Sequence, residues 1–169
     1  MLRTRMTDPL GMHDTFYRPT HDVSARLAVM YHRTPTGLKR AGLQQKLRDS
    51  GLIKVGSGIV SSASDLARFL QMHLRDGENI LPRELALEMR RDQTGGRWNK
   101  DPMGGENSGY GLGWQLGDEG IFFHAGAFGS LIWADARRGR GVVLLAQTPI
   151  HNVYDLWRKV IPELMDAVC

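Results

Sequence analysis

The chain has 169 residues, of which 41% are hydrophobic and 24% charged, and its formal net charge is +4. This length and apolar fraction are sufficient for one domain with its own core. The basic residues are scattered, with the densest cluster at Arg137, Arg138 and Arg140, so no contiguous patch favours nucleic-acid binding. The only cysteine is Cys169, which excludes an intrachain disulfide and a thiolate zinc site within this chain.

The start of the chain is polar and irregular. No apolar core of a signal peptide follows Met1, and the longest strongly apolar stretch, 141–146, is too short to span a bilayer. We therefore expect a cytoplasmic protein without a membrane span, provided that Met1 is the true start. The His-Asp pairs at 13–14 and 21–22 resemble metal ligands but lie in proline-flanked loops. Surface Asx-type turns are the better interpretation, and no metal is expected there.

Two helices are expected in the middle of the chain. Ser62 and Asp65 have the spacing of a capping box, in which each side chain bonds the other's backbone N–H. An apolar face follows, made of Leu66, Phe69, Leu70 and Leu74. His73 falls near this face, which favours a core histidine over a ligand. Gly77 is a stop signal, and Pro82 suits the first turn of a second helix with Leu85 and Met89 on one side.

The last third of the chain changes from helical to strand periodicity. Residues 94–109 are rich in glycine and polar groups, which predicts a mobile loop. Four short aromatic or β-branched runs with tight turns between them then predict an antiparallel meander, at 110–116, 121–124, 130–136 and 141–147. A continuous apolar stripe over 152–168 predicts a final helix, with a kink at Pro162. The fold class is therefore α/β (α+β): an antiparallel sheet of three to five strands with this helix packed on one face.

Motifs of several enzyme classes are absent from the sequence. It contains no GxxxxGK[ST], HExxH or GxSxG, and residues 109–113 (GYGLG) lack the third glycine of a dinucleotide loop. The sequence therefore indicates no cofactor.

Four stretches, in order, resemble the C-terminal part of the serine β-lactamase-related, penicillin-binding-protein-like family of class C β-lactamases, esterases and DD-peptidases. Residues 8–15 resemble its PLGM-x-DT loop, 56–69 its GG-x-x-ST-x-x-DLA-RF segment, and 110–114 its YGLGW strand. Residues 124–126, followed by Gly129, resemble the H-x-G form of its third active-site motif. The resemblance spans nearly the whole chain. It implies a partial β-lactamase/transpeptidase-like fold, with residues 1–169 as a single partial domain.

The same resemblance implies the site residues. The third motif lines the active site, so His124 and the backbone N–H of Ala127 are the candidate catalytic groups, the latter as an oxyanion donor. His124 stands where many members have lysine, and Ala125, Gly126 and Gly129 are the candidate substrate-binding residues. Glycine at 126 would let substrate lie close to the strand. The alternative is an ordinary strand that ends in a glycine turn.

The departure from the family pattern concerns the nucleophile. The family's S-x-x-K and its Y-x-N or S-x-N motif do not occur in this sequence, and acyl transfer needs a nucleophile in contact with a base. We expect a C-terminal fragment or split half of a serine hydrolase for ester, amide or β-lactam substrates, inactive without an N-terminal half that carries both motifs. An unpaired sheet edge also predicts a homo-oligomer. The alternative is a non-enzymatic module that binds ligands or peptides.

Overall fold

The computed structural model describes residues 2–17, 20–41, 58–98 and 108–167. Its centre is a five-stranded antiparallel sheet in which the strands are hydrogen-bonded in the order of the sequence. These strands are β3 (Gly109–Tyr110), β4 (Gln115–Leu116), β5 (Ile121–Gly126), β6 (Ser130–Asp135) and β7 (Arg140–Leu145). The meander predicted from the two-residue period is therefore confirmed, except that the run predicted at 110–116 forms two short paired strands, β3 and β4, and not one.

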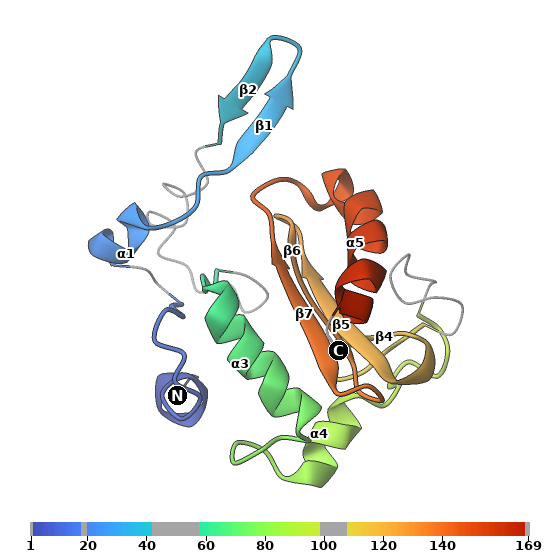
Figure 1. Cartoon of the computed structure of the whole chain (residues 1–169). Coiled ribbons are helices and arrows are strands. Elements are labelled where there is room, and N and C mark those ends of the chain that lie inside the picture. Colours follow the sequence, from blue (N-terminus) through green and yellow to red (C-terminus); the bar gives the residue numbers. More distant parts are fainter. Residues whose placement is uncertain (1, 18–19, 42–57, 99–107, 168–169) are drawn as a thin grey trace.

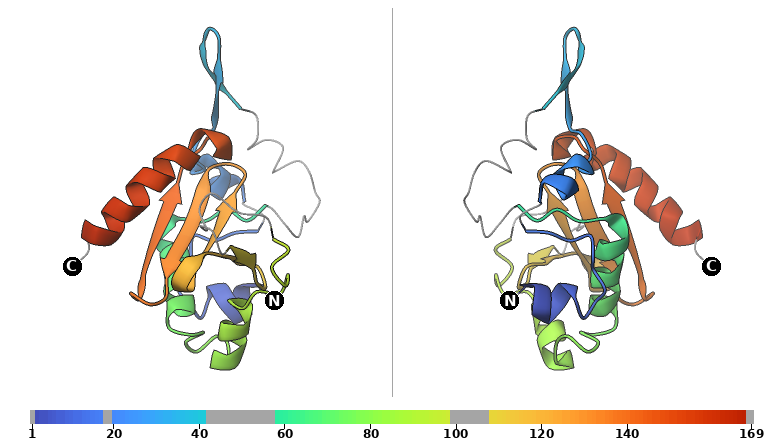
Figure 2. Two further views of the ribbon diagram at one scale, coloured as in Figure 1. Left: turned by 90° about the vertical axis from the view of Figure 1, so that its right-hand side faces the viewer. Right: turned by 90° about the vertical axis from the view of Figure 1, so that its left-hand side faces the viewer.

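Helices cover the two faces of the sheet (Figures 1 and 2). The longer ones are α3 (Ala63–Leu74), α4 (Arg83–Met89) and α5 (Tyr154–Ala167). Shorter turns are η1 (Arg3–Thr7), α1 (His21–Ala25), η2 (Asp118–Gly120) and η3 (Ile150–Asn152). The strands β1 (Tyr31–Thr34) and β2 (Gly37–Arg40) form a separate hairpin that projects from the body (Figure 1). None of the described helices is long and apolar enough to cross a membrane.

Two hydrophobic clusters form because successive side chains of β5 point to opposite faces of the sheet. Phe122 packs with Leu70 of α3 and with Trp114 on one face. Phe123 packs on the other face with Trp157 of α5. All five side chains are at most 2% exposed, and burying each contributes about 1.5–3 kcal/mol. The sheet is thus a rigid support for the end of β5, where the candidate residues lie.

The predicted helices are present, with one difference in facing. The C-terminal helix occupies Tyr154–Ala167 and contains Pro162, while the kink there stays a prediction. In α4 the buried residue is Ala86, whereas Leu85, which was expected to share one side of the helix with Met89, is 52% exposed. This short helix packs through a small side chain. Residues 99–107 of the expected mobile loop lie outside the described residues.

Only one of the two hydrogen bonds of the predicted capping box is formed. The Ser62 hydroxyl accepts the Asp65 N–H at 3.2 Å, as expected. The Asp65 carboxylate is turned elsewhere and accepts the Asp14 N–H at 2.7 Å and the Thr15 hydroxyl at 2.9 Å. It also accepts a hydrogen bond from Arg68 at 3.0 Å. Asp65 therefore ties the loop at residues 14–15 to the start of α3.

Candidate functional site

The candidate site is the hairpin that joins β5 to β6. Residues 127–129 make the connection, and the Gly129 N–H donates to the Gly126 carbonyl at 3.0 Å. Gly129 has φ of +86° and is buried, which is the arrangement of a three-residue hairpin with a glycine bulge. A Cβ there would lie 2.8 Å from the Thr148 carbonyl oxygen. The backbone itself therefore requires glycine at this position.

A neighbouring segment holds the hairpin tip in place. The Ala146 N–H donates to the Gly129 carbonyl at 2.8 Å, and the Ile150 N–H donates to the Ala127 carbonyl at 3.0 Å. Ala127 is exposed, and among the described residues its own N–H has no hydrogen-bond partner. A free donor on a backbone fixed from both sides is what an oxyanion site needs.

His124 lies three residues before this donor, on the face of β5 that also carries Phe122. Its side chain is exposed, and its Nε2 is 3.2 Å from the Tyr110 hydroxyl. The two rings meet edge to face, with centroids 6.4 Å apart and planes at 79°. The sequence placed Tyr110 in a motif strand and not in the site, so the structure adds it.

An aspartate organises the strand that carries Tyr110. Asp92 accepts the Thr94 hydroxyl at 2.6 Å, the Gly96 N–H at 2.8 Å and the Tyr110 N–H at 3.2 Å. These donors, first the Thr94 side chain, hold the pKa of the Asp92 carboxyl well below its usual range. Trp98 covers the Tyr110 ring at 4.5 Å between centroids. The sequence signal that identifies this turn is Asp92-x-Thr94-x-Gly96, an Asx-type pattern.

The predicted substrate-binding residues have structural roles of their own. Ala125 points to the opposite face of β5 from His124 and packs against the α5 cluster. A Cβ on Gly126 would meet the Ser130 hydroxyl at 2.3 Å. The space beside Gly126 is thus filled by this chain, which gives glycine a reason that involves no substrate. The structure therefore brings together His124, Ala127 and Gly129 at the hairpin, and it adds Tyr110 beside them.

The His-Asp pairs do not form a metal site in the part of the chain that is described. Asp14 is paired with Arg26 at 2.8 Å, and this hydrogen bond lowers the pKa of the Asp14 carboxyl. His21 and Asp22 are both exposed, 3.8 Å apart. Within the described residues no three His, Cys, Asp or Glu side chains gather to hold a metal ion.

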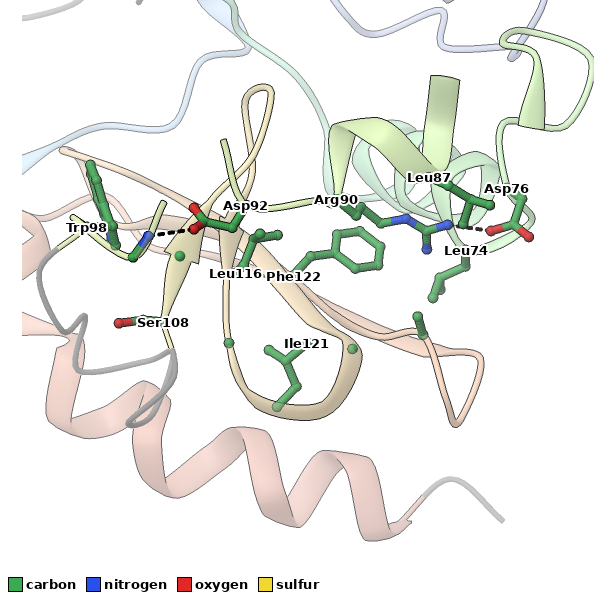
Figure 3. A pocket seen from close by; sticks show the side chains of 15 residues that line it. Leu74, Asp76, Leu87, Arg90, Asp92, Trp98, Ser108, Leu116, Ile121 and Phe122 are labelled. Carbon is green, nitrogen blue, oxygen red and sulfur yellow. Dashed lines mark hydrogen bonds and ion pairs between the residues drawn. The ribbon is translucent and has the colours of Figure 1, made fainter. Parts of the chain in front are cut away.

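A cavity of about 830 Å³ lies at the other end of β5 (Figure 3). Leu74, Leu87 and Phe122 supply part of its apolar wall. Its charged lining residues are Asp76, Arg90 and Asp92. Arg90 is ion-paired with Asp76 and lies over the Phe122 ring at 5.1 Å. The Arg90 charge is therefore already satisfied within the chain, and the cavity is separate from the hairpin that carries His124.

Comparison with known proteins gives the family. The sequence matches the Beta-lactamase family over residues 1–159, and the chain belongs to that family. No curated protein matches it.

Solved structures share the fold at low sequence identity. EstCE1, a hydrolase with promiscuous acyltransferase activity, has a TM-score of 0.74 and 22% identity over 91% of this chain. The octameric penicillin-binding protein homologue from Pyrococcus abyssi has a TM-score of 0.71 and 22% identity over 94%. A class C β-lactamase has a TM-score of 0.68 and 16% identity over 99% of this chain. The matches cover 47%, 36% and 50% of those chains, so this chain spans half their length or less.

Proposed function

We propose that this chain is one half of a serine hydrolase that acts on ester, amide or β-lactam acyl groups, and that residues 1–169 form a single partial domain. The observation that carries the proposal is the β5–β6 hairpin. It presents an exposed Ala127 N–H, three residues after His124, that has no hydrogen-bond partner in the described part of the chain. The family match and the half-length coverage of the structural relatives support it. The missing chemistry, S-x-x-K and Y-x-N, would come from an N-terminal half.

The hairpin supplies two groups to such a reaction. The Ala127 N–H donates to the oxygen of the attacked carbonyl, where negative charge develops, and a fixed donor of this kind contributes about 3–4 kcal/mol to the transition state. His124 is placed to bind the substrate or the tyrosine of the absent motif. Neither group is an activated serine, so the chain alone should not turn over substrate.

The outer edge of β7 is where we expect another chain to pair. Among the described strands β7 is hydrogen-bonded to β6 alone. Residues 142–145 are apolar, and Leu145 is 41% exposed. An apolar edge of this kind is a template for association. The isolated chain should therefore form a dimer or higher oligomer in light scattering, and a clean monomer over a wide concentration range would count against this.

The test is to complete the enzyme. The coding sequence ahead of Met1 is read, and a segment with in-frame S-x-x-K and Y-x-N is co-expressed with this chain. The complex should hydrolyse nitrocefin or a p-nitrophenyl ester with saturable kinetics. Each half alone should not exceed a nonspecific protein control. Turnover by this chain alone, lost on mutating Ser130 or His124, would overturn the proposal.

One substitution in the complex addresses the oxyanion donor directly. Ala127→Pro removes the backbone N–H. Ala127 is the second residue of the turn that Gly126 begins, and proline is well tolerated at the second position of a turn. We expect kcat to fall about 10²- to 10³-fold with an unchanged circular dichroism spectrum. Ala127→Ser keeps the N–H and is the matched control. Equal activity of the two variants would contradict the role given to this donor.

The second candidate is a ligand- or peptide-binding module, favoured by an intact hairpin in a sequence without S-x-x-K. It would bind an acyl-peptide such as D-alanyl-D-alanine at the hairpin without turnover. Shifts of the Ala127 and Gly129 amide signals on titration, together with no hydrolysis in any mixture, would favour it over the split enzyme.

A further inference from the structure

The two imidazole nitrogens of His124 have different surroundings. The imidazole has two nitrogens, and only one of them contacts the rest of the described chain. Tyr110 Oη lies 3.2 Å from Nε2, and the structure gives Nδ1 no partner among the described residues. The nitrogen that meets a ligand is therefore decided by Tyr110.

The strength of donors and acceptors decides the direction of the bond. A phenol is a better donor than a neutral imidazole N–H, and an unprotonated imidazole nitrogen is a better acceptor than a phenol oxygen. The stronger arrangement has the Tyr110 hydroxyl donating to Nε2. Neutral His124 then carries its proton on Nδ1.

We propose that Tyr110 is a positioning residue of this site: it holds His124 by Nε2, fixes the Nδ1–H tautomer, and so leaves Nδ1–H as a donor for the ligand. The ligand atom facing it must be an acceptor, such as a carbonyl or carboxylate oxygen. This deepens the proposed acyl-transfer function and rests on it for the identity of the ligand. The hydrogen bond between Tyr110 and His124, which we call the tether, does not depend on that function.

Tyr110 can act in this way because its strand is held from the other side. The Asp92 carboxylate accepts the Tyr110 N–H, and the Gln93 N–H donates to the Tyr110 carbonyl at 2.8 Å. Trp98 packs against the Tyr110 ring, with the ring centroids 4.5 Å apart. Asp92 and Trp98 thus set the place of the hydroxyl without touching His124.

The experiment reads the tautomer in the full chain. Long-range ¹H–¹⁵N spectra of the ¹⁵N-labelled protein are recorded at pH 8, and the His124 signals among the six histidines are assigned from His124→Gln. In the wild type we expect the Nδ1–H form to predominate. In Tyr110→Phe the ratio of Nδ1–H to Nε2–H should fall about fivefold, the usual net effect of one hydrogen bond. Tyr31→Phe, which removes an exposed hydroxyl elsewhere, is the matched control.

Asp92→Asn tests the support of the strand. The new amide places an N–H₂ group against the Gly96 or Tyr110 N–H, so the turn loosens and the His124 ratio should move in the same direction as in Tyr110→Phe. Asp155→Asn, on the exposed face of α5, is the control. Circular dichroism and unshifted His73 signals show whether the variants remain folded.

Several outcomes would overturn the proposal. One is an Nε2–H form that predominates in the wild type, and another is a His124 ratio that Tyr110→Phe leaves unchanged. Because no substrate or second half is present, this result is independent of the completion test. A lost tether leaves the split-hydrolase proposal standing, and a failed completion leaves the tether standing.

Discussion

Two regions of the molecule carry family-like motifs, and they use their polar groups in opposite ways. At the start of α3, the Asp65 carboxylate is 3% exposed and accepts hydrogen bonds from the loop at 14–15 and from Arg68. At the end of β5, His124 and Ala127 are exposed, and the Ala127 N–H is unbonded among the described residues. The first region satisfies its polar groups internally, while the second presents them.

This difference separates the motifs that build the fold from the motif that we propose for the site. The PLGM-x-DT and DLA-RF stretches meet each other through Asp65, so each depends on the other for its hydrogen bonds. The His124 side chain at the hairpin is exposed, and Tyr110 is the one hydrogen-bond partner that the described residues give it. The two regions should therefore respond differently to mutation, in stability at α3 and in chemistry at the hairpin.

The largest effect is expected from Asp65→Ala. It leaves the half-buried Asp14 N–H and Thr15 hydroxyl, and the partly exposed Arg68 guanidinium, without their common acceptor. The free energy of unfolding should fall by about 3–4 kcal/mol, measured by urea denaturation. Asp155→Ala, an exposed carboxylate on α5, should change it by less than about 0.5 kcal/mol. Equal losses of stability in the two variants would contradict the role of Asp65 in joining the loop at 14–15 to α3.

The pH dependence of stability should come from His73, near the C-terminal end of α3. His73 is 1% exposed among Phe69, Trp114 and Phe122, and burial, followed by the charge of Arg90, lowers its pKa to about 4. Between pH 6.5 and 4 the unfolded chain therefore binds the proton that the folded chain refuses. Stability is full above pH 6.5 and should fall by up to about 3 kcal/mol as the pH drops to 4.

The measurement is a series of urea titrations from pH 8 to pH 4. His73→Phe keeps an aromatic ring in the cluster and removes the titration, so its curve should be flatter across this window. His151→Gln, an exposed histidine, is the control. A wild-type curve that stays level down to pH 4 would show that His73 does not carry the dependence.

An effect on stability smaller than that of Asp65→Ala is expected from alanine substitution of the two hairpin glycines, and the loss should differ between them. Gly129→Ala forces a side chain into the left-handed region and places its Cβ 2.8 Å from the fixed Thr148 carbonyl, so we expect a loss of about 2–3 kcal/mol. Gly126→Ala meets only the Ser130 hydroxyl, which can rotate away, and should cost about 1 kcal/mol or less. Thermal denaturation of the pair decides this, and a reversed order would mean that the hairpin backbone differs from the one described.

The sequence predicted what depends on local periodicity. The strands and the last helix follow from the two-residue period and the apolar stripe, and His73 was placed correctly in the core. The second partner of Asp65 was missed because it lies 51 residues away in the sequence, beyond what capping-box spacing can indicate. Tyr110 was missed as a partner of His124 for the same reason, since their contact depends on how β3, β4 and β5 pair. Asp92 had a local signal, its Asx-type pattern, which was read only as part of a loop.

The smallest expected effect on stability, and the sharpest contrast with Asp65, is His124→Ala. The side chain is exposed, and its hydrogen bond to Tyr110 is the one that the described residues give it, so the free energy of unfolding should fall by about 1 kcal/mol or less. The isolated wild-type chain should not hydrolyse nitrocefin, and the variant should be identical to it in that assay. In a completed enzyme the same substitution should lower kcat/KM, because a donor to the substrate is lost while the fold is unchanged. His124→Gln, which retains a hydrogen-bond donor, should lose less. If His124→Ala instead destabilised the chain as much as Asp65→Ala, His124 would belong to the framework and not to the site.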